Sequence, residues 1–140
     1  MKGPTVADAL LRDELVEIPK NRERQFGCSG KMLKPSRKSV EALVRKIPRG
    51  EIATIALLRQ ALADKHGAQT TCPFLTKRAL LAIAKDPAAN APYWRVVVAR
   101  GEMIDAYPGG AAAQAKRLKA EGVGITTNKV ADLPDRLASL

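Results

Sequence analysis

The stretch SRKSVEALVRKIPRGEIATIALLRQAL, residues 36–62, decides the fold because its apolar residues repeat at helical spacing on both sides of a turn. Ser36 precedes the first repeat, and its hydroxyl can accept a hydrogen bond from a free amide of a first helical turn. The repeat itself has the i, i+3, i+4, i+7 spacing of one buried stripe, formed by Val40, Leu43, Val44 and Ile47. These features predict a helix that begins after Ser36 and ends at the turn Pro48-Arg49-Gly50.

Two more helices are predicted after that turn. Thr54 can cap the first of them, and Gly67 can close it in the left-handed conformation. Its buried stripe consists of Ile55, Leu58 and Leu62. The next helix begins near Cys72-Pro73, with proline in the first turn, and stops before Asp86-Pro87. Three short helices, the last two joined by a few residues, are compatible with a helix-turn-helix arrangement.

The flanking segments have weaker patterns. Residues 5–16 are predicted as an amphipathic helix and residues 20–35 as an irregular basic loop or arm. Residues 94–99 are a β-type run that turns at Arg100-Gly101 and returns over residues 102–104, which predicts a small β-hairpin. A loop at 107–110 leads into a helix over 111–121 that Gly122 closes. The fold class is therefore mainly α with a small β-hairpin, divided into an N-terminal helix and arm (1–35), a central domain (36–125) and a C-terminal extension (126–140).

Composition narrows the function classes. The 140 residues carry a formal charge of +10, and residues 20–49 contain ten basic side chains against Glu23 and Glu41. Such a field attracts polyanions, so we expect a nucleic-acid partner, with a solvated basic face as the plainer interpretation. One histidine and two separated cysteines offer no metal site, and we expect no cofactor. No apolar run approaches the length of a membrane span or signal peptide, so a cytoplasmic location is expected.

Four stretches within residues 36–125 together resemble the DNA-binding, active-site domain of the O6-alkylguanine-DNA alkyltransferases and of the non-catalytic alkyltransferase-like proteins. VRKIPRGEIATIALL resembles the opening helix, the Ile-Pro-x-Gly turn and the next helix of that domain, and TKRALLAIAKDP resembles its recognition helix and hinge. PYWRVVVARG resembles the active-site strand, and YPGGAAAQAKRLKAEG the pocket loop and closing helix. The resemblance implies a helix-turn-helix, winged-helix-like fold that binds DNA.

The departures from the family's pattern argue against catalysis. The acceptor cysteine and activating histidine of the alkyltransferases correspond here to Tyr93 and Trp94. Alkyl transfer needs a thiolate and a neighbouring base, whereas a phenol has an ordinary pKa near ~10. Glu121 matches the glutamate that orients the family's histidine, and neither Cys28 nor Cys72 falls at the acceptor position. We therefore expect that this protein is not an alkyl-accepting enzyme; a displaced Cys28 nucleophile is the remaining enzymatic interpretation.

The resemblance implies a base pocket formed by Tyr93, Trp94, Arg95, Tyr107 and Gly109. Tyr93 and Trp94 either stack on an extruded base or fill the pocket as packing residues. Arg95 is expected to pair internally and brace the strand. Tyr107 either offers its hydroxyl to the base or its sugar, or packs as a buried tyrosine.

The resemblance also implies DNA contacts at Thr54, Thr71, Thr76, Lys77 and Arg78. The recognition helix of the family carries an arginine that replaces the extruded nucleotide. The local pattern favours Arg78 for that position, and counting back from the active-site strand favours Lys77 or Thr76. A simple phosphate contact is the alternative role, and for Lys77 it is the favoured one. The threonines are expected to bind phosphate, with helix capping as the alternative for at least one of them.

These features lead to two hypotheses of function. In the first, a monomer binds double-stranded DNA, recognises alkylated guanine by base flipping, and flags it for repair proteins. In the second, the same fold has a closed pocket and serves as a non-specific nucleic-acid or protein-binding module. The Tyr-x-Gly-Gly loop at Tyr107 favours the first, and Ile55, which replaces a family tyrosine that presses on the DNA backbone, favours the second.

Overall fold

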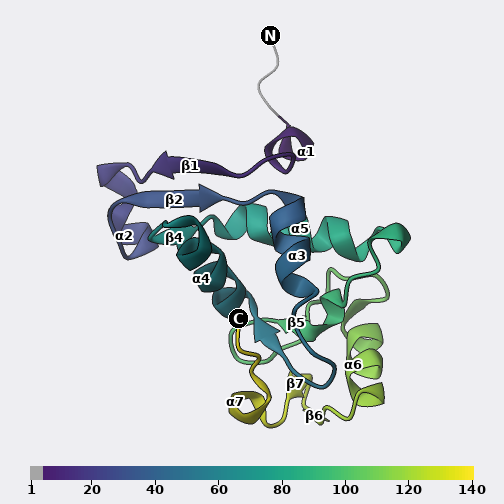
Figure 1. The fold of residues 1–140 in the computed structure, drawn as a ribbon. Helices are drawn as coiled ribbons and strands as arrows, with labels where there is room; N and C mark the ends of the chain where they lie inside the picture. The colour runs from purple at the N-terminus through teal and green to yellow at the C-terminus, as the bar shows by residue number, and fades with distance from the viewer. Residues whose placement is uncertain (1–4) are drawn as a thin grey trace.

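The computed structural model describes residues 5–140, a mainly helical chain with three small sheets (Figure 1). The N-terminal elements are α1 (Val6–Ala9), β1 (Glu14–Glu17), η1 (Lys20–Arg22), α2 (Glu23–Phe26) and β2 (Lys31–Lys34). The central elements are α3 (Arg37–Val44), β3 (Ala53–Thr54), α4 (Ile55–His66), β4 (Thr70–Thr71) and α5 (Pro73–Ala84). Next come η2 (Pro87–Ala89), η3 (Tyr93–Arg95), β5 (Val96–Val97), α6 (Gly110–Ala120), β6 (Ile125–Thr126), β7 (Lys129–Val130) and α7 (Leu133–Arg136). Within residues 5–140 no helix is both long and apolar enough to cross a membrane.

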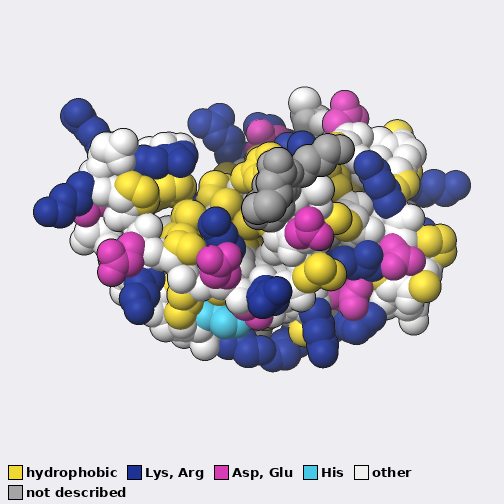
Figure 2. All heavy atoms as spheres, turned by 90° about the horizontal axis from the view of Figure 1, so that it is seen from above, with side chains coloured by type: hydrophobic (Ala, Val, Ile, Leu, Met, Phe, Trp, Pro, Cys, Tyr) yellow, Lys and Arg dark blue, Asp and Glu magenta, His cyan; other side chains and the backbone are white. Residues whose placement is uncertain are grey.

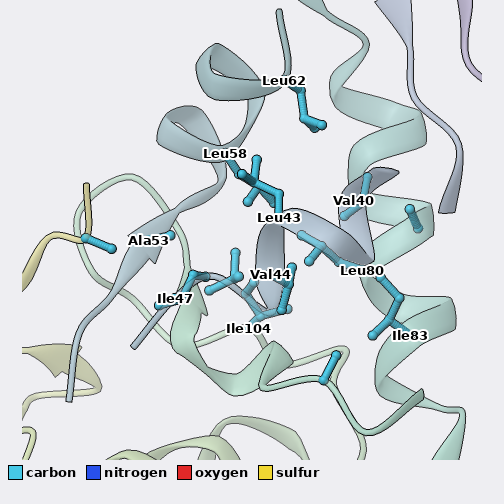
Figure 3. Packing of buried hydrophobic residues seen from close by; sticks show 14 of the residues in the cluster. Val40, Leu43, Val44, Ile47, Ala53, Leu58, Leu62, Leu80, Ile83 and Ile104 are labelled. Atoms are coloured by element: carbon cyan, nitrogen blue, oxygen red, sulfur yellow. The ribbon is translucent and has the colours of Figure 1, made fainter. Parts of the chain in front are cut away.

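The three predicted central helices are confirmed as α3, α4 and α5. The Ser36 hydroxyl accepts a hydrogen bond from the Ser39 amide at 3.1 Å, and the Thr54 hydroxyl accepts one from the Leu57 amide at 3.0 Å. Gly67 closes α4 at φ +68°. The stripe of α3 packs against buried leucines and isoleucines of α4 and α5, which point toward one another in the main core (Figure 3). Local caps and helical stripes therefore position α5 against the rest of the domain.

The prediction of a helix over residues 5–16 is wrong. The helix ends at Ala9, and residues 14–17 instead form β1, which pairs antiparallel with β2. The register places Glu14 opposite Lys34 and Glu17 opposite Lys31, so opposite charges face each other across the strands. The segment that was expected to be irregular, residues 20–35, therefore contains a strand whose partner lies in the N-terminal segment.

Strand β2 also pairs parallel with β4, the two-residue strand in the connection between α4 and α5. Gln69 strengthens this contact with two hydrogen bonds to Lys31. Its side-chain oxygen accepts from the Lys31 backbone amide at 2.6 Å, and its backbone amide donates to the Lys31 carbonyl at 3.0 Å. The β1–β2 pair and its connecting η1 and α2 thus extend directly from the α4–α5 connection (Figure 1).

The predicted hairpin over residues 94–104 does not form. Only Val96–Val97 is a strand there, and it pairs parallel with β3, while Glu102 forms a single bridge with Lys129. A hairpin is present further on, where β6 and β7 flank Thr127 and Asn128, both at positive φ (51° and 62°). Those angles suit a tight hairpin turn, but without a glycine the sequence shows no strong turn signal.

A second, smaller core lies under the C-terminal part of the chain. It joins Ile52, Val97, Met103, Leu118, Val123 and Val130. The C-terminal segment also returns to the start of β3, because the Ala138 amide donates to the Ile52 carbonyl at 2.9 Å. This second core fixes α6 beside η3, where the site described next is formed.

Candidate functional site

A cleft of about 400 Å³ opens between the C-terminal end of α5, the η2 loop, η3 and α6. Tyr93 and Trp94 from η3 line one part of it, together with Arg117 from α6 and Pro108 from the loop before α6. Lys85, just after α5, contributes a second cation. The cleft therefore combines aromatic and apolar walls with positively charged side chains.

Three aromatic rings form a connected group at this cleft. The Tyr93 ring lies edge-on to Trp94, with centroids 5.3 Å apart, and edge-on to Tyr107, with centroids 5.0 Å apart. Such edge-to-face pairs are worth about 0.5–1.5 kcal/mol beyond the burial of their surface. Tyr93 and Trp94 are half-buried, so each of these two rings keeps some surface toward solvent.

Trp94 is held in place by Glu121. The indole N–H donates to Glu121 Oε2 at 3.0 Å, and the Arg95 guanidinium donates to the same carboxylate from Nε at 2.9 Å and from Nη2 at 2.8 Å. Arg95 Nη1 also donates to the Ile47 carbonyl at 2.7 Å, so this arginine pairs internally, as expected. The indole thus makes the contact to Glu121 that the resemblance assigns to a histidine.

The Glu121 carboxylate is ionised in this arrangement. Its side chain is 6% exposed, and this burial opposes ionisation. Hydrogen bonds from Arg95, from Trp94 and from the Gly50 amide outweigh that burial, so the pKa of Glu121 lies below its ordinary range. The ion pair is buried on both sides, since the Arg95 side chain is 14% exposed.

Arg117 covers the outer side of the aromatic group. Its Cζ atom lies 4.4 Å from the Trp94 ring centroid and 5.8 Å from that of Tyr93. The arginine itself is exposed at the mouth of the cleft. Sequence reasoning missed the contact of Arg117 with Trp94, because the pattern of the helix over 111–121 does not show which ring lies beside its cations.

Three of the predicted pocket residues do not line the cleft. Tyr107 is buried, its hydroxyl donates to the Val96 carbonyl at 3.4 Å, and burial followed by the nearby Tyr93 raises its pKa above the ordinary value. Arg95 is engaged by Glu121. Gly109 precedes α6 at φ +80°, where a Cβ would lie 2.6 Å from the Ala113 Cβ, so it has a backbone role.

Sequence reasoning also missed Gln114, which braces the strand beside the cleft. This side chain is buried, and its amide nitrogen donates to the carbonyls of Trp94 and Val96 at 3.0 and 2.9 Å. Its oxygen accepts from the Ile104 amide at 2.6 Å. A polar residue on the inward stripe of the helix at 111–121 was the available signal, since buried amides need partners.

The five predicted DNA-contact residues divide into two groups. Lys77 and Arg78 are exposed on α5, where the Arg78 guanidinium lies 5.1 Å from the ring of the exposed Phe74. The prediction that Thr71 and Thr76 bind phosphate is wrong, because both are fully buried and their hydroxyls donate to the carbonyls of Arg59 and Cys72. Thr54 caps α4; its contact with DNA stays a prediction.

Several arginines of residues 20–49 bond to carboxylates and carbonyls of the protein itself. Arg37 pairs with Asp86 and Glu41, and hydrogen bonding to Arg37 and to the Ala88 amide keeps the pKa of Asp86 below its ordinary value. Arg45 donates to the Ala89 carbonyl and Arg49 to the Ala120 carbonyl.

The cations of η1 and α2, in contrast, are exposed: Lys20, Arg22 and Arg24. Figure 2 shows Lys and Arg side chains projecting from that end of the molecule, on the left as in Figure 1.

No family model and no curated protein matches this chain. Among solved structures, it is similar to S. pombe Atl1 in complex with damaged DNA containing O6-carboxymethylguanine, with 25% identity and a TM-score of 0.55. It is also similar to S. pombe ATL in complex with DNA, with 23% identity and a TM-score of 0.55. Each similarity covers 74% of this chain and 94% of the other. The resemblance to the alkyltransferase-like family is thereby confirmed.

Proposed function

We propose that this protein is a non-catalytic DNA-binding protein of the alkyltransferase-like type, which receives an alkylated guanine in the cleft beside Tyr93 and Trp94. One observation carries the proposal: a cleft opens beside Tyr93 and Trp94, the positions that the resemblance matches to the family's acceptor cysteine and activating histidine, and its wall is aromatic instead of nucleophilic. The similarity to an S. pombe protein solved with damaged DNA supports the same assignment. A monomer that marks the lesion for repair proteins is the role that follows.

In the proposed complex, α4 and α5 act as a helix-turn-helix pair with α5 in a groove. The exposed side chains Lys77 and Arg78 lie on the outer face of α5 and suit contacts to DNA. The exposed cations of η1 and α2, together with Lys116 and Lys119 on α6, would hold phosphates. Such contacts position the protein on the duplex without reading the sequence.

Base flipping would bring the modified guanine to the cleft. Unstacking a nucleotide costs a few kcal/mol and costs least where pairing is already weakened, which favours damaged sites. Stacking of the base on an aromatic side chain returns about 1–3 kcal/mol. The half-buried rings of Tyr93 and Trp94 offer that surface.

Alkyl transfer to the protein is not part of the proposal. The reaction needs a thiolate with a base beside it, and the corresponding positions hold a phenol and an indole. The Glu121 carboxylate is already occupied by Trp94 and Arg95. Among the described residues that line the cleft, none is a cysteine.

Fluorescence anisotropy with two short duplexes tests the proposal. The duplexes differ in one O6-methylguanine, and each is titrated at low and at moderate salt. Tighter binding of the modified duplex that persists in added salt is expected, because the base contact is not a counterion effect. Absence of binding to both duplexes contradicts the proposal and points to a protein partner.

A second candidate function is a non-specific nucleic-acid module with a closed pocket. It is favoured by Arg117, which covers Trp94, and by the Tyr107 hydroxyl, which faces the Val96 carbonyl. Ile55 is half-buried against the core and offers no aromatic ring to the DNA backbone. Equal, salt-sensitive binding of both duplexes would select this function.

A further inference from the structure

We infer that the cleft selects a modified base whose substituent carries a negative charge, and that Arg117 makes this selection. The inference rests on the proposed function and names the class of adduct that its site prefers. Arg117 lies at the cleft mouth, stacked on the Trp94 ring and near that of Tyr93. A base that enters beside these rings brings its substituent within reach of the guanidinium.

The charge of Arg117 is not matched inside the protein. Within the described chain, Arg117 takes part in no ion pair shorter than 4 Å. Its contacts are the two aromatic rings, so within the described residues its N–H groups remain available to an acceptor. A carboxylate is the acceptor that best fits this fork, because it can take two parallel hydrogen bonds.

Glu121, four residues after Arg117, and Asp86, in the cleft lining, are both engaged by other groups. Glu121, one helical turn beyond Arg117, accepts hydrogen bonds from Trp94, Arg95 and Gly50. Asp86 lines the cleft, but Arg37 and the Ala88 amide hold its oxygens. Lys85 adds a further cation to the lining. The unmatched charge of the cleft is therefore positive.

A neutral alkyl substituent would gain less at this position. The apolar lining from Ile83, Ala84 and Pro108 accommodates a methyl or methylene group in either kind of adduct. An anionic adduct keeps this contact and adds charge-assisted hydrogen bonds to Arg117. The expected preference over a neutral adduct of equal size is about fivefold to tenfold, which is less than a buried charge-assisted hydrogen bond would give because Arg117 is exposed to solvent.

Three duplexes of one sequence test the inference. They contain guanine, O6-carboxymethylguanine, or the neutral isostere O6-carbamoylmethylguanine at a single position. Dissociation constants are measured by fluorescence anisotropy for the unaltered protein, for Arg117→Met, which keeps the length of the side chain without its charge, and for Arg117→Lys. Lys116→Met is the matched control, since Lys116 is an exposed cation of the same helix that does not line the cleft.

The unaltered protein should bind the carboxymethyl duplex about fivefold to tenfold more tightly than the carbamoylmethyl duplex. Arg117→Met should abolish this ratio, Arg117→Lys should keep part of it, and Lys116→Met should lower all affinities by one factor and leave the ratio intact. Circular dichroism checks that each variant is folded.

Two results overturn the inference while the proposed function stands: both adducts bind equally and above plain guanine, or Arg117→Met keeps the preference. If neither adduct binds more tightly than plain guanine, the proposed function itself fails and the inference fails with it. The duplex with plain guanine therefore separates the two failures.

Discussion

Trp94 gives the candidate site an aromatic ring without the acid–base capacity of a histidine. The indole has one N–H donor and no acceptor, so its hydrogen bond to Glu121 orients the ring. An imidazole at this position could also take a proton, which an indole cannot do at neutral pH. The contact to the carboxylate is retained, and the capacity for acid–base chemistry is absent.

Glu121→Ala should destabilise the protein by about 3 kcal/mol, because it leaves the buried Arg95 guanidinium without its carboxylate. The free energy of unfolding in urea measures this loss. Glu17→Ala, on the exposed face of an edge strand, is the control and should change stability by less than about 0.5 kcal/mol. Equal effects of the two substitutions would contradict the structural role of Glu121.

Protonation of Glu121 at acid pH should lower the free energy of unfolding. The pKa of Glu121 is lower in the folded protein than the ordinary value of about 4.3, so between these two pKa values the unfolded chain binds more protons. The stabilisation that ionised Glu121 provides is complete above the ordinary pKa of a glutamate, and it is lost as the pH falls through the lower pKa that Glu121 has in the folded protein. Urea midpoints from pH 3 to pH 7 should fall less steeply at acid pH for Glu121→Gln than for the unaltered protein.

At the scale of elements, α5 has two faces that the sequence alone could not separate. Thr76 and Lys77 are neighbours, yet Thr76 is fully buried and Lys77 is exposed. A shift of one residue turns a helix by about 100°, so the register decides which side chain meets DNA. Burial excludes Thr76 from the nucleotide-replacing position that the resemblance implies, and leaves Lys77 and Arg78 as its candidates.

Lys77→Ala should weaken binding to modified and unmodified duplexes by the same factor and reduce the slope of log affinity against log salt by about 0.9. Thr76→Val should leave that slope unchanged and instead cost about 1 kcal/mol of stability, since its hydroxyl donates to the Cys72 carbonyl. Anisotropy titrations and urea unfolding distinguish the two effects. A loss of DNA affinity in Thr76→Val with normal stability would overturn the register.

The connection between β1 and β2 offers a matched pair of glycines. Gly27 and Gly30 both have positive φ, +68° and +107°, but a Cβ on Gly30 would lie 2.3 Å from Gln69 Oε1, whereas Gly27 has open space around it. Gly30→Ala must therefore disturb the Gln69 contact to Lys31.

Gly27→Ala should cost about 1 kcal/mol, the ordinary penalty of a left-handed alanine. Gly30→Ala should cost about 2–3 kcal/mol, because backbone strain adds to the displaced Gln69 side chain. Urea unfolding of the two variants measures the difference. Equal losses would show that Gln69 does not hold this connection to the α4–α5 segment.

At the scale of the whole molecule, some cations bind groups within the protein and others are exposed to solvent. Arg37, Arg45 and Arg49 contact carboxylates or carbonyls of distant segments. The cations of η1 and α2 project from one end of the molecule, on a connection that the β2–β4 pairing joins to the base of α5 (Figures 1 and 2). In the proposed complex, this end would contact phosphates beside the groove assigned to α5.

Replacing Lys20, Arg22 and Arg24 together with alanine should lower affinity for both duplexes equally and flatten the salt slope by about 0.9 for each phosphate that these cations neutralise. A second triple variant, with the same change in net charge, carries alanine at Lys65, Arg100 and Lys129, which are exposed elsewhere. Anisotropy at several salt concentrations compares the two. An equal fall in affinity for both variants would mean that net charge alone, and not this end of the molecule, is responsible.

The sequence by itself determined the three central helices and showed that a tyrosine and a tryptophan stand where the resemblance expects the acceptor cysteine and its histidine. An apolar stripe such as Val40 and Val44 repeats within about one helical turn, and the Ser36 and Thr54 side chains each accept a hydrogen bond from an amide three residues later. Residue type alone excludes a thiolate at position 93, which is a tyrosine. These effects are local, so a pattern along the chain contains them.

Only the tertiary structure decided which segments meet. It paired β2 with β1 and β4, buried Thr71 and Thr76, and brought Glu121 to Trp94 and Arg95 from 27 and 26 residues away. Strand partners and ion pairs depend on the packing of the whole chain. A threonine could bind phosphate if it lay on the exposed face of a helix, but on the other face it is a core residue. The physical reason is that burial and long-range pairing are properties of the fold and are absent from any short window of sequence.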